Sequence, residues 1–307
     1  MAGVSDRSSR EIARRMGCNL VYTEMISAEG LARGDAKTIG LIDTDGEAPP
    51  VAVQLFGVDP HRMAQAARIV QDRGADLIDI NAGCPARKVV NSGAGAALLR
   101  DLPRLAAILR ETRKAITIPL TLKIRSGWDA QSLVDVEAAR MAEIEGLDAI
   151  ALHPRTRQQA FGGAADWTRI AAVRQAVSIP VIGNGDVWCG ADARRMARET
   201  GCDAVMIGRG AMGNPWALRA ALEALTTDRP GAECDREVPV GERLTLMMDH
   251  ARSMVARKGE RRGVLEMRKL VSGYLKGIRD SRPLRMELMT CETLAQMEEK
   301  IGAFKEK

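Results

Sequence analysis

The sequence predicts an α/β protein, a (β/α)8 TIM barrel with an abbreviated N-terminus, followed by a small all-helical domain. Three stretches, at 73–81, 145–153 and 200–208, each end a helix on glycine and then run into an apolar strand. A second, proline-led phrase alternates with them at 118–124 and 179–184. Strands and helices that alternate in this way favour parallel βαβ units. A chain of 307 residues can hold one barrel of about 250 residues with a small appendage.

Seven strands are predicted, whereas a closed barrel has eight. They are Val21–Met25, Val51–Leu55, Leu77–Asn81, Leu120–Ile124, Ala149–His153, Val181–Gly183 and Ala204–Ile207. Amphipathic helices are expected between them, for example at 62–73, 134–145 and 192–200. The first helix should begin near Asp6, so we expect the missing strand to precede Met1. The first and last strands would then be unpaired edges. The alternative is an open seven-stranded sheet.

The strand and helix rhythm stops after residue 227, which predicts a boundary between two domains. Residues 1–227 form the predicted barrel, and the proline- and glycine-containing stretch 228–241 is predicted to be a linker. From 242 to 307 leucine, methionine and valine recur at three- and four-residue steps, which indicates helices throughout.

The charge of the chain is concentrated in the predicted helical domain. The formal net charge is +5, with a pI near 9.0. Between Arg252 and Arg285 many cations are opposed by Glu260, Glu266 and Asp280. Such a cluster indicates a polyanionic partner. No apolar run reaches the roughly 18 residues of a membrane span, and the N-terminus has no signal-peptide pattern, so a cytoplasmic protein is expected.

The cysteine pattern gives no sign of a metal site or a disulfide framework. The six cysteines include no C-x-x-C pair, and the chain has three histidines. We therefore expect most of the thiols to be small buried hydrophobic groups. Cys84 is the exception, because it lies in a Gly-Cys-Pro loop directly after a predicted strand.

Polar residues gather where the predicted strands end, which is where barrel enzymes place their chemistry. These candidates are Gln54, Asn81, Cys84, Lys123, Arg125, His153, Arg155, Arg157, Asn184, Asp186, Gly208 and Arg209. Taken singly, several are ambiguous: His153 could be a core histidine, and Lys123 could reach solvent. The Gly-Arg-Gly sequence at 208–210 is typical of a phosphate site at a strand–helix junction.

Two chemical interpretations are open for Cys84. Arg87 and Lys88 follow closely and could favour a nucleophilic thiolate. An unperturbed thiol titrates near about 8.5, however, so it is mostly protonated at neutral pH and can act as a general acid. The fold could also bring His153 across to it.

Several longer motifs carry a resemblance to a known family. They are residues 1–6 (MAGVSD), 79–89 (DINAGCPARKV), 122–128 (LKIRSGW), 153–157 (HPRTR) with 163–167 (GAADW), 182–186 (IGNGD) and 206–209 (MIGR). Together they resemble the tRNA-dihydrouridine synthases, most closely the bacterial B-type subgroup, over essentially the whole chain.

The resemblance implies an FMN-bound barrel and a helical tRNA-binding domain. Met1 and Ala2 would lie against the flavin, and Gln54 and Lys123 would bond the polar edge of its ring. The ribityl and phosphate groups would be held by a further set, namely His153, Asn184, Gly185, Asp186, Gly208 and Arg209. No metal is implied, and we expect a monomer.

The resemblance also implies the reaction. NADPH would reduce the flavin, hydride would pass from its N5 to C6 of a D-loop uracil, and Cys84 would protonate C5. Asn81, Arg125 and Arg155 would contact the uracil or its phosphate. The base would have to leave its stack to react.

The sequence departs from the family pattern at its start and in its aromatic content. The usual first strand, and a proline before the Met-Ala-Gly segment, are missing from this sequence. Aromatic residues make up 3%, so base stacking would rely on Tyr274, Trp128 or arginine planes. Two other functions stay open: a flavin barrel that reduces a small molecule, and an inactive tRNA-binding relic.

Overall fold

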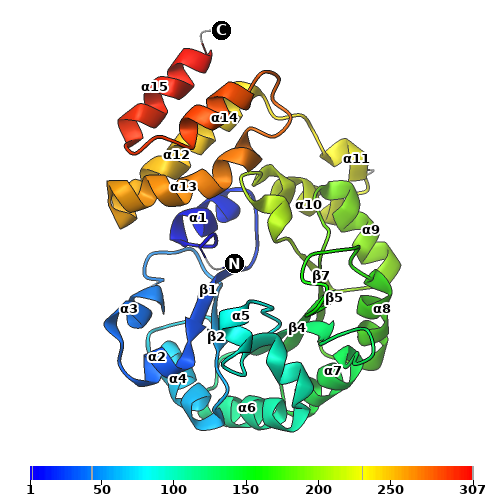
Figure 1. Ribbon diagram of the computed structural model, residues 1–307. Helices are drawn as coiled ribbons and strands as arrows, with labels where there is room; N and C mark the ends of the chain where they lie inside the picture. The colour runs from blue at the N-terminus through cyan, green and yellow to red at the C-terminus, as the bar shows by residue number, and fades with distance from the viewer. Residues whose placement is uncertain (2, 43, 230, 306–307) are drawn as a thin grey trace.

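One parallel sheet organises the N-terminal two thirds of the protein (Figure 1). The computed structural model describes residues 1, 3–42, 44–229 and 231–305. Within them the strand order is β1-β2-β3-β4-β5-β6-β7, and the sheet curls inside a ring of helices. The strands are β1 (Val21–Ser27), β2 (Val51–Phe56), β3 (Leu77–Ala82), β4 (Leu120–Gly127), β5 (Ala149–Thr156), β6 (Val181–Asn184) and β7 (Ala204–Met206).

The predicted seven strands are confirmed, with β1 and β7 as the two ends of the sheet. The fold is thus an abbreviated TIM barrel. Two strands run three residues further than predicted: β4 continues to Gly127 and β5 to Thr156. They stay paired beyond their apolar runs, with Arg125 opposite His153 and Gly127 opposite Thr156.

The helices of the sheet region include the three predicted at 62–73, 134–145 and 192–200, each within two residues of the predicted ends. The helices of this region are α1 (Arg7–Arg15), α2 (Ala28–Ala32), α3 (Ala36–Ile39), α4 (Pro60–Asp72), α5 (Arg87–Val90), α6 (Leu102–Ala115), α7 (Asp135–Ile144), α8 (Trp167–Ala176), α9 (Gly190–Thr200) and α10 (Trp216–Thr226). Their starts follow local chemistry. Asp6 caps α1 and Asp59 caps α4, each with a side-chain oxygen that accepts from a backbone N–H of the first turn. The apolar core fills the space between sheet and helices, with Met63, Ile78 and Ile108 fully buried.

The C-terminal helices form a second core of their own. They are α12 (Val240–Lys258), α13 (Glu260–Tyr274), α14 (Arg282–Leu288) and α15 (Leu294–Lys305), and the short α11 (Gly231–Cys234) precedes them inside the stretch predicted to be a linker. Trp216 of α10 packs into this second core. None of the described helices is both long and apolar enough to cross a bilayer.

The first helix joins the two parts of the chain. In Figure 1 α1 lies beneath α12 and α13. Ser8 of α1 hydrogen-bonds Ser253 of α12 at 2.8 Å, and Lys258 pairs with Asp6. The N-terminal segment is therefore packed against the helical domain as well as the sheet.

Candidate active site at the strand ends

A chain of buried side chains runs across β4, β3 and β2 and ends at the Cys84 loop. Thr121 Oγ1 donates to Asp79 Oδ1 at 2.6 Å, and Gln54 Nε2 donates to Asp79 Oδ2 at 2.7 Å. Asn81 Nδ2 then donates to Gln54 Oε1 at 2.9 Å. Asn81 Oδ1 accepts from the backbone N–H of Cys84 at 2.9 Å. The carboxylate therefore fixes the orientation of both amides, and the second amide holds the cysteine loop.

Asp79 is the anchor of this relay, the chain from Thr121 to Cys84, and it is completely buried. Burial raises the pKa of Asp79 to about 6, and the hydrogen bonds from Thr121 and Gln54 limit the rise. The charge of Lys123 also favours the ionised carboxylate.

Cys84 lies partly exposed on the loop between β3 and α5. Its carbonyl accepts from the backbone N–H of Ala96 at 3.0 Å. Arg125 Nε donates to the carbonyl of Gly83 at 3.0 Å, so the loop is held from a second side. No hydrogen bond joins Cys84 to His153 in the described part of the chain, and Arg87 and Lys88 are exposed to solvent. Among the described residues, no hydrogen bond joins the Cys84 thiol to a base.

Asp186 forms ion pairs with two arginines that lie at neighbouring strand ends. Arg155 binds it bidentately, with Nη1 to Oδ1 at 2.9 Å and Nη2 to Oδ2 at 2.6 Å. Arg209 Nη2 lies 3.2 Å from Oδ1, and the N–H of Ala165 donates to Oδ2. Burial acts in the opposite direction, but these donors hold the pKa of Asp186 below its ordinary value.

His153 is buried against this cluster and is neutral. Burial lowers the pKa of His153 to about 2, and the charges of Lys123, Arg125, Arg155 and Arg209 add to the effect. Arg155 Nη1 lies 3.2 Å from Nε2. Because a guanidinium can only donate, Nε2 is the unprotonated acceptor and Nδ1 carries the proton.

Gly185 must be glycine at its position beside this ring. Its φ is +115°, which side chains rarely adopt. A Cβ there would also lie 2.8 Å from Cδ2 of His153. The β6 end therefore approaches His153 as closely as backbone can.

Lys123 faces the same space without a hydrogen-bond acceptor among the described residues. Burial, followed by the charge of Arg125, lowers the pKa of Lys123 to about 7. Burial and Arg155 likewise lower the pKa of Arg125 to about 10, although Arg125 also bonds the carbonyls of Thr156 and Ala160. The strand ends carry more positive charge than their carboxylates balance.

The other predicted site residues lie at the open side of the sheet. An ideal Cβ on Gly208 would lie 3.7 Å from Sδ of Met1, so Met1 reaches from the β1 side to the β7 end. Asn184 Nδ2 donates to the carbonyl of Met206 at 2.7 Å, which ties β6 to β7. Ala2 lies outside the described residues.

The structure corrects one of the expected stacking aromatics. Tyr274 is 1% exposed inside the helical core, where its hydroxyl bonds His250, so it cannot stack on a base. Trp128 is partly exposed, and the guanidinium groups of Arg100 and Arg157 each lie 4.8 Å from a ring centroid.

Sequence reasoning also missed residues that matter at this end of the sheet. Asp79 and Thr121 were not singled out as candidates, although alternation along a strand places Asp79 on the same face as Asn81. The exposed aromatic rings at the strand ends belong to Phe161 and Trp188. No sequence pattern predicts that a ring will stay exposed.

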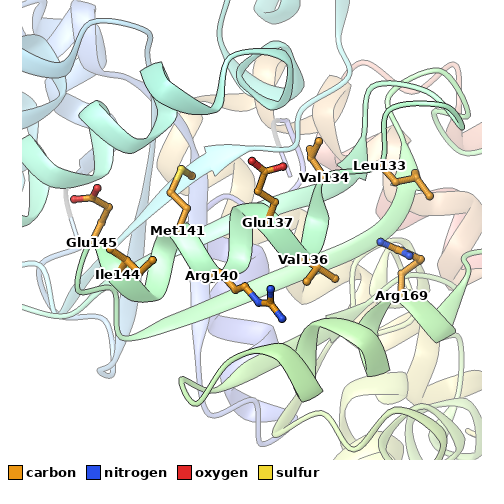
Figure 2. A pocket seen from close by; sticks show the side chains of 9 residues that line it. All are labelled: Leu133, Val134, Val136, Glu137, Arg140, Met141, Ile144, Glu145 and Arg169. Atoms are coloured by element: carbon orange, nitrogen blue, oxygen red, sulfur yellow. The ribbon is translucent and has the colours of Figure 1, made fainter.

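The described residues contain no group of three His, Cys, Asp or Glu that could hold a metal ion. Figure 2 shows a pocket of about 600 Å³ on the outer side of the barrel, lined by α7 residues with Leu133, Val134 and Arg169. Its lining includes Val136 and Met141 but none of the strand-end residues. It is therefore separate from the candidate site.

Comparisons with known proteins agree with this geometry. A family model described as dihydrouridine synthase (Dus) matches residues 1–307. The tRNA-dihydrouridine synthase B of Pseudomonas aeruginosa is 40% identical over 289 residues, which are 94% of this chain and 85% of the relative. That of Pectobacterium carotovorum is 39% identical over 305 residues, 99% of this chain and 94% of the relative.

A solved structure supports the fold. Histamine dehydrogenase from Rhizobium sp. 4-9 superposes with a TM-score of 0.55 at 15% identity, over 81% of this chain and 47% of the other. The family model and the relatives, which span nearly the whole chain, decide the family. The chain belongs to the dihydrouridine synthase family.

Proposed function

We propose that the protein reduces a uridine of tRNA to dihydrouridine at the strand-end site, with FMN as bound cofactor, NADPH as reductant and Cys84 as proton donor. Family membership and relatives named for tRNA support the substrate. The observation that supports a binding site at the strand ends is the concentration of positive charge there. Lys123, Arg125, Arg155 and Arg209 converge at the strand ends, where Asp186 forms ion pairs with Arg155 and Arg209.

A phosphate-bearing cofactor fits this surplus of positive charge. Arg209 and the backbone at Gly208 would bind the phosphate, in the usual position of the phosphate site of TIM barrels. Asn184, Gly185 and Asp186 would line the ribityl chain together with His153, whose neutral ring adds no charge there. Gln54 and Lys123 would contact the polar edge of the ring, and Met1 with Ala2 would lie against it.

The residues of the chain divide the chemistry between positioning and proton transfer. Bound FMN would supply the hydride that C6 of uracil takes up. Asn81, Arg125 and Arg155 would orient the base, and Arg125 would stabilise negative charge that develops on it. Cys84 would hold the proton at Sγ and deliver it to C5, so that hydride and proton together saturate the double bond. The Asn81 bond to the Cys84 N–H fixes the loop that aims the thiol.

The helical domain would bind the phosphates of the tRNA. Arg261, Lys269, Lys276 and Arg279 are exposed or partly exposed on or near α13, where a polyanion can reach them. Affinity should then fall steeply as salt concentration rises. We expect a monomer that works in the cytoplasm on D-loop uridines, with residues 1–227 as the catalytic part and 242–307 as the tRNA-binding part.

Replacement of Cys84 tests the proposal. Cys84→Ala should keep the flavin absorbance of the purified protein but lower the rate of dihydrouridine formation by about 10²- to 10⁴-fold, the usual contribution of a general acid. The substrate is an unmodified tRNA transcript, and the product is measured by mass spectrometry. Cys18→Ala, at a partly exposed cysteine that precedes β1 and so lies away from the strand ends, is the matched control.

The same measurements separate the other two functions. A colourless protein that binds tRNA would indicate the inactive relic. A flavin-bearing protein that reduces a small enone but does not bind tRNA at low salt would indicate a small-molecule reductase. Wild-type turnover by Cys84→Ala would refute the proton-donor role.

A further inference from the structure

Trp188 exposes a large ring beside the strand-end site, and neither the fold nor the proposed reaction uses it. It lies on the loop between β6 and α9 and is 44% exposed. Trp216, by contrast, is packed inside the helical core. A large exposed aromatic ring in a chain with so few of them suggests an external partner.

Two cations lie near the ring. Arg209 lies 5.4 Å from a ring centroid and Lys276 lies 5.9 Å from it. Arg209 belongs to the strand-end site, whereas Lys276 follows α13 in the helical domain. Trp188 therefore lies where the candidate active site meets the basic domain, and its surroundings favour an anionic partner.

Backbone packing fixes the position of Trp188 against the strand-end site. An ideal Cβ on Gly210 would lie 2.3 Å from the carbonyl oxygen of Val187 and 3.1 Å from Cα of Trp188. Any larger residue at 210 would displace this backbone. The loop that carries Trp188 therefore packs directly against the loop that carries Arg209.

The same loop is packed as tightly against the helical domain. A Cβ on Gly213 would lie 2.2 Å from the carbonyl oxygen of Leu270, and one on Gly273 would lie 2.0 Å from that of Met212. Lys276 comes one turn after Gly273, and Arg243 Nη2 donates to its carbonyl at 2.6 Å. Trp188 and Lys276 are therefore held in a fixed relation, although they belong to different parts of the chain.

We propose that Trp188 and Lys276 form a stacking platform for an unpaired nucleotide of the tRNA that neighbours the nucleotide in the strand-end site. The base would stack on the indole, and its phosphate would pair with Lys276. Stacking of this kind accepts any base, because every base has a π face. The platform rests on tRNA being the substrate, and it would keep the strand splayed while its neighbour occupies the active site.

Two substitutions separate stacking from charge. Trp188→Ala should weaken tRNA binding by about 5- to 100-fold, the range for loss of one base–aromatic stack, and Trp188→Phe should recover most of it. The plot of log affinity against log salt should keep its slope. Lys276→Met should instead reduce that slope by roughly 0.7 to 0.9, because one phosphate contact is lost.

Flavin content and the rate of flavin reduction by NADPH should stay at wild-type values in all three variants. Ile144→Ala, a highly exposed apolar residue on α7, is the control for surface changes and should match the wild type. Wild-type tRNA affinity in Trp188→Ala would overturn the proposal. So would loss of flavin from that variant, which would make the ring a wall of the cofactor site. Because the readout is binding, a failure of dihydrouridine formation in the wild type would be a separate result.

Discussion

The cations at the strand ends change one another's ionisation. Lys123 and Arg125 lie on the same face of β4, two residues apart; Arg125 is buried and Lys123 is partly buried. Burial lowers the pKa of each; the charge of Arg125 adds to the effect on Lys123, and the charges of Arg155 and Arg209 add to the effect on Arg125. An anion bound among these cations would raise their pKa values again, because it favours the protonated, positively charged form of each side chain.

This gives Lys123 a testable pH signature. With a pKa of about 7, Lys123 loses its charge as pH rises above 7, so the affinity of the apoprotein for FMN should fall by up to about tenfold per pH unit between pH 7.5 and 9. Lys123→Arg keeps its charge in this range and should bind FMN with little pH dependence. Quenching of flavin fluorescence in titrations at each pH measures both. Equal slopes in the two proteins would show that Lys123 does not contact the cofactor as a cation.

At the scale of the strands, register explains how the relay forms. Gln54 of β2 lies opposite Asp79 of β3, and Asp79 lies opposite Thr121 of β4. Asn81 follows two residues after Asp79 and so faces the same side of the sheet. Three neighbouring strands thus place the buried Asp79 carboxylate next to the amides of Gln54 and Asn81. Because each amide is oriented by the hydrogen bond before it, Asn81 presents its oxygen to the Cys84 N–H.

Asp79→Asn should leave the direction of the relay in place. An asparagine can keep its amide oxygen toward Gln54 Nε2 and direct its NH2 group to the Thr121 hydroxyl, which can accept a hydrogen bond. Gln54 and Asn81 then need not turn round. We therefore expect near wild-type flavin content and a near wild-type rate of uridine reduction in single turnover.

Asp79→Ala is the variant that removes the acceptor. It leaves buried donors on Gln54 and Thr121 without an acceptor, which should lower the free energy of unfolding by about 1–3 kcal/mol. Because the two amides of the relay then lose their fixed orientation, the rate of uridine reduction in single turnover should fall at least about tenfold. If Asp79→Ala turns over uridine like the wild type, the relay has no role in positioning Cys84.

Strand positions could be predicted because apolar runs after glycine or proline are local signals. The ends of β4 and β5 could not, because Arg125 and Arg155 look like loop residues and are buried through contacts across the sheet. The family motifs identified the residues that line the strand ends, and the family prediction is confirmed. The exposure of Trp188 and the burial of Tyr274 depend on how the two parts of the chain pack, which no local pattern records.

At the scale of the whole molecule, α1 and its N-cap Asp6 connect the barrel to the helical domain; we call this contact region the joint. Lys258 of α12 pairs with Asp6 before α1 and with Glu266 of α13. Beside it His250 is buried, with Nδ1 3.0 Å from the hydroxyl of Tyr274 and Nε2 3.3 Å from Oγ of Ser9. Both ring nitrogens thus have partners on two different helices, and the ring is fixed at the joint.

The joint should make stability depend on pH. Burial lowers the pKa of His250 to about 4; Asp6 opposes the change and Lys258 adds to it. An unfolded histidine titrates near about 6.5. Between these values the unfolded chain binds more protons, so the free energy of unfolding falls on acidification by ~1.4 kcal/mol per pH unit for each such histidine. His153 acts in the same direction, whereas Asp79, whose pKa is raised to about 6, acts against it.

Two histidines opposed by one aspartate leave a net loss of ~1.4 kcal/mol per pH unit from about pH 6 to 4.5. His250→Gln keeps a polar group between Ser9 and Tyr274 but removes one titrating ring. Its free energy of unfolding should therefore be nearly constant across that range. Urea unfolding of the apoprotein at half-unit pH steps measures both curves. Parallel curves of unfolding free energy against pH for the two proteins would mean that protonation of His250 does not destabilise the fold. The loss of stability in acid would then have to come from groups in the barrel.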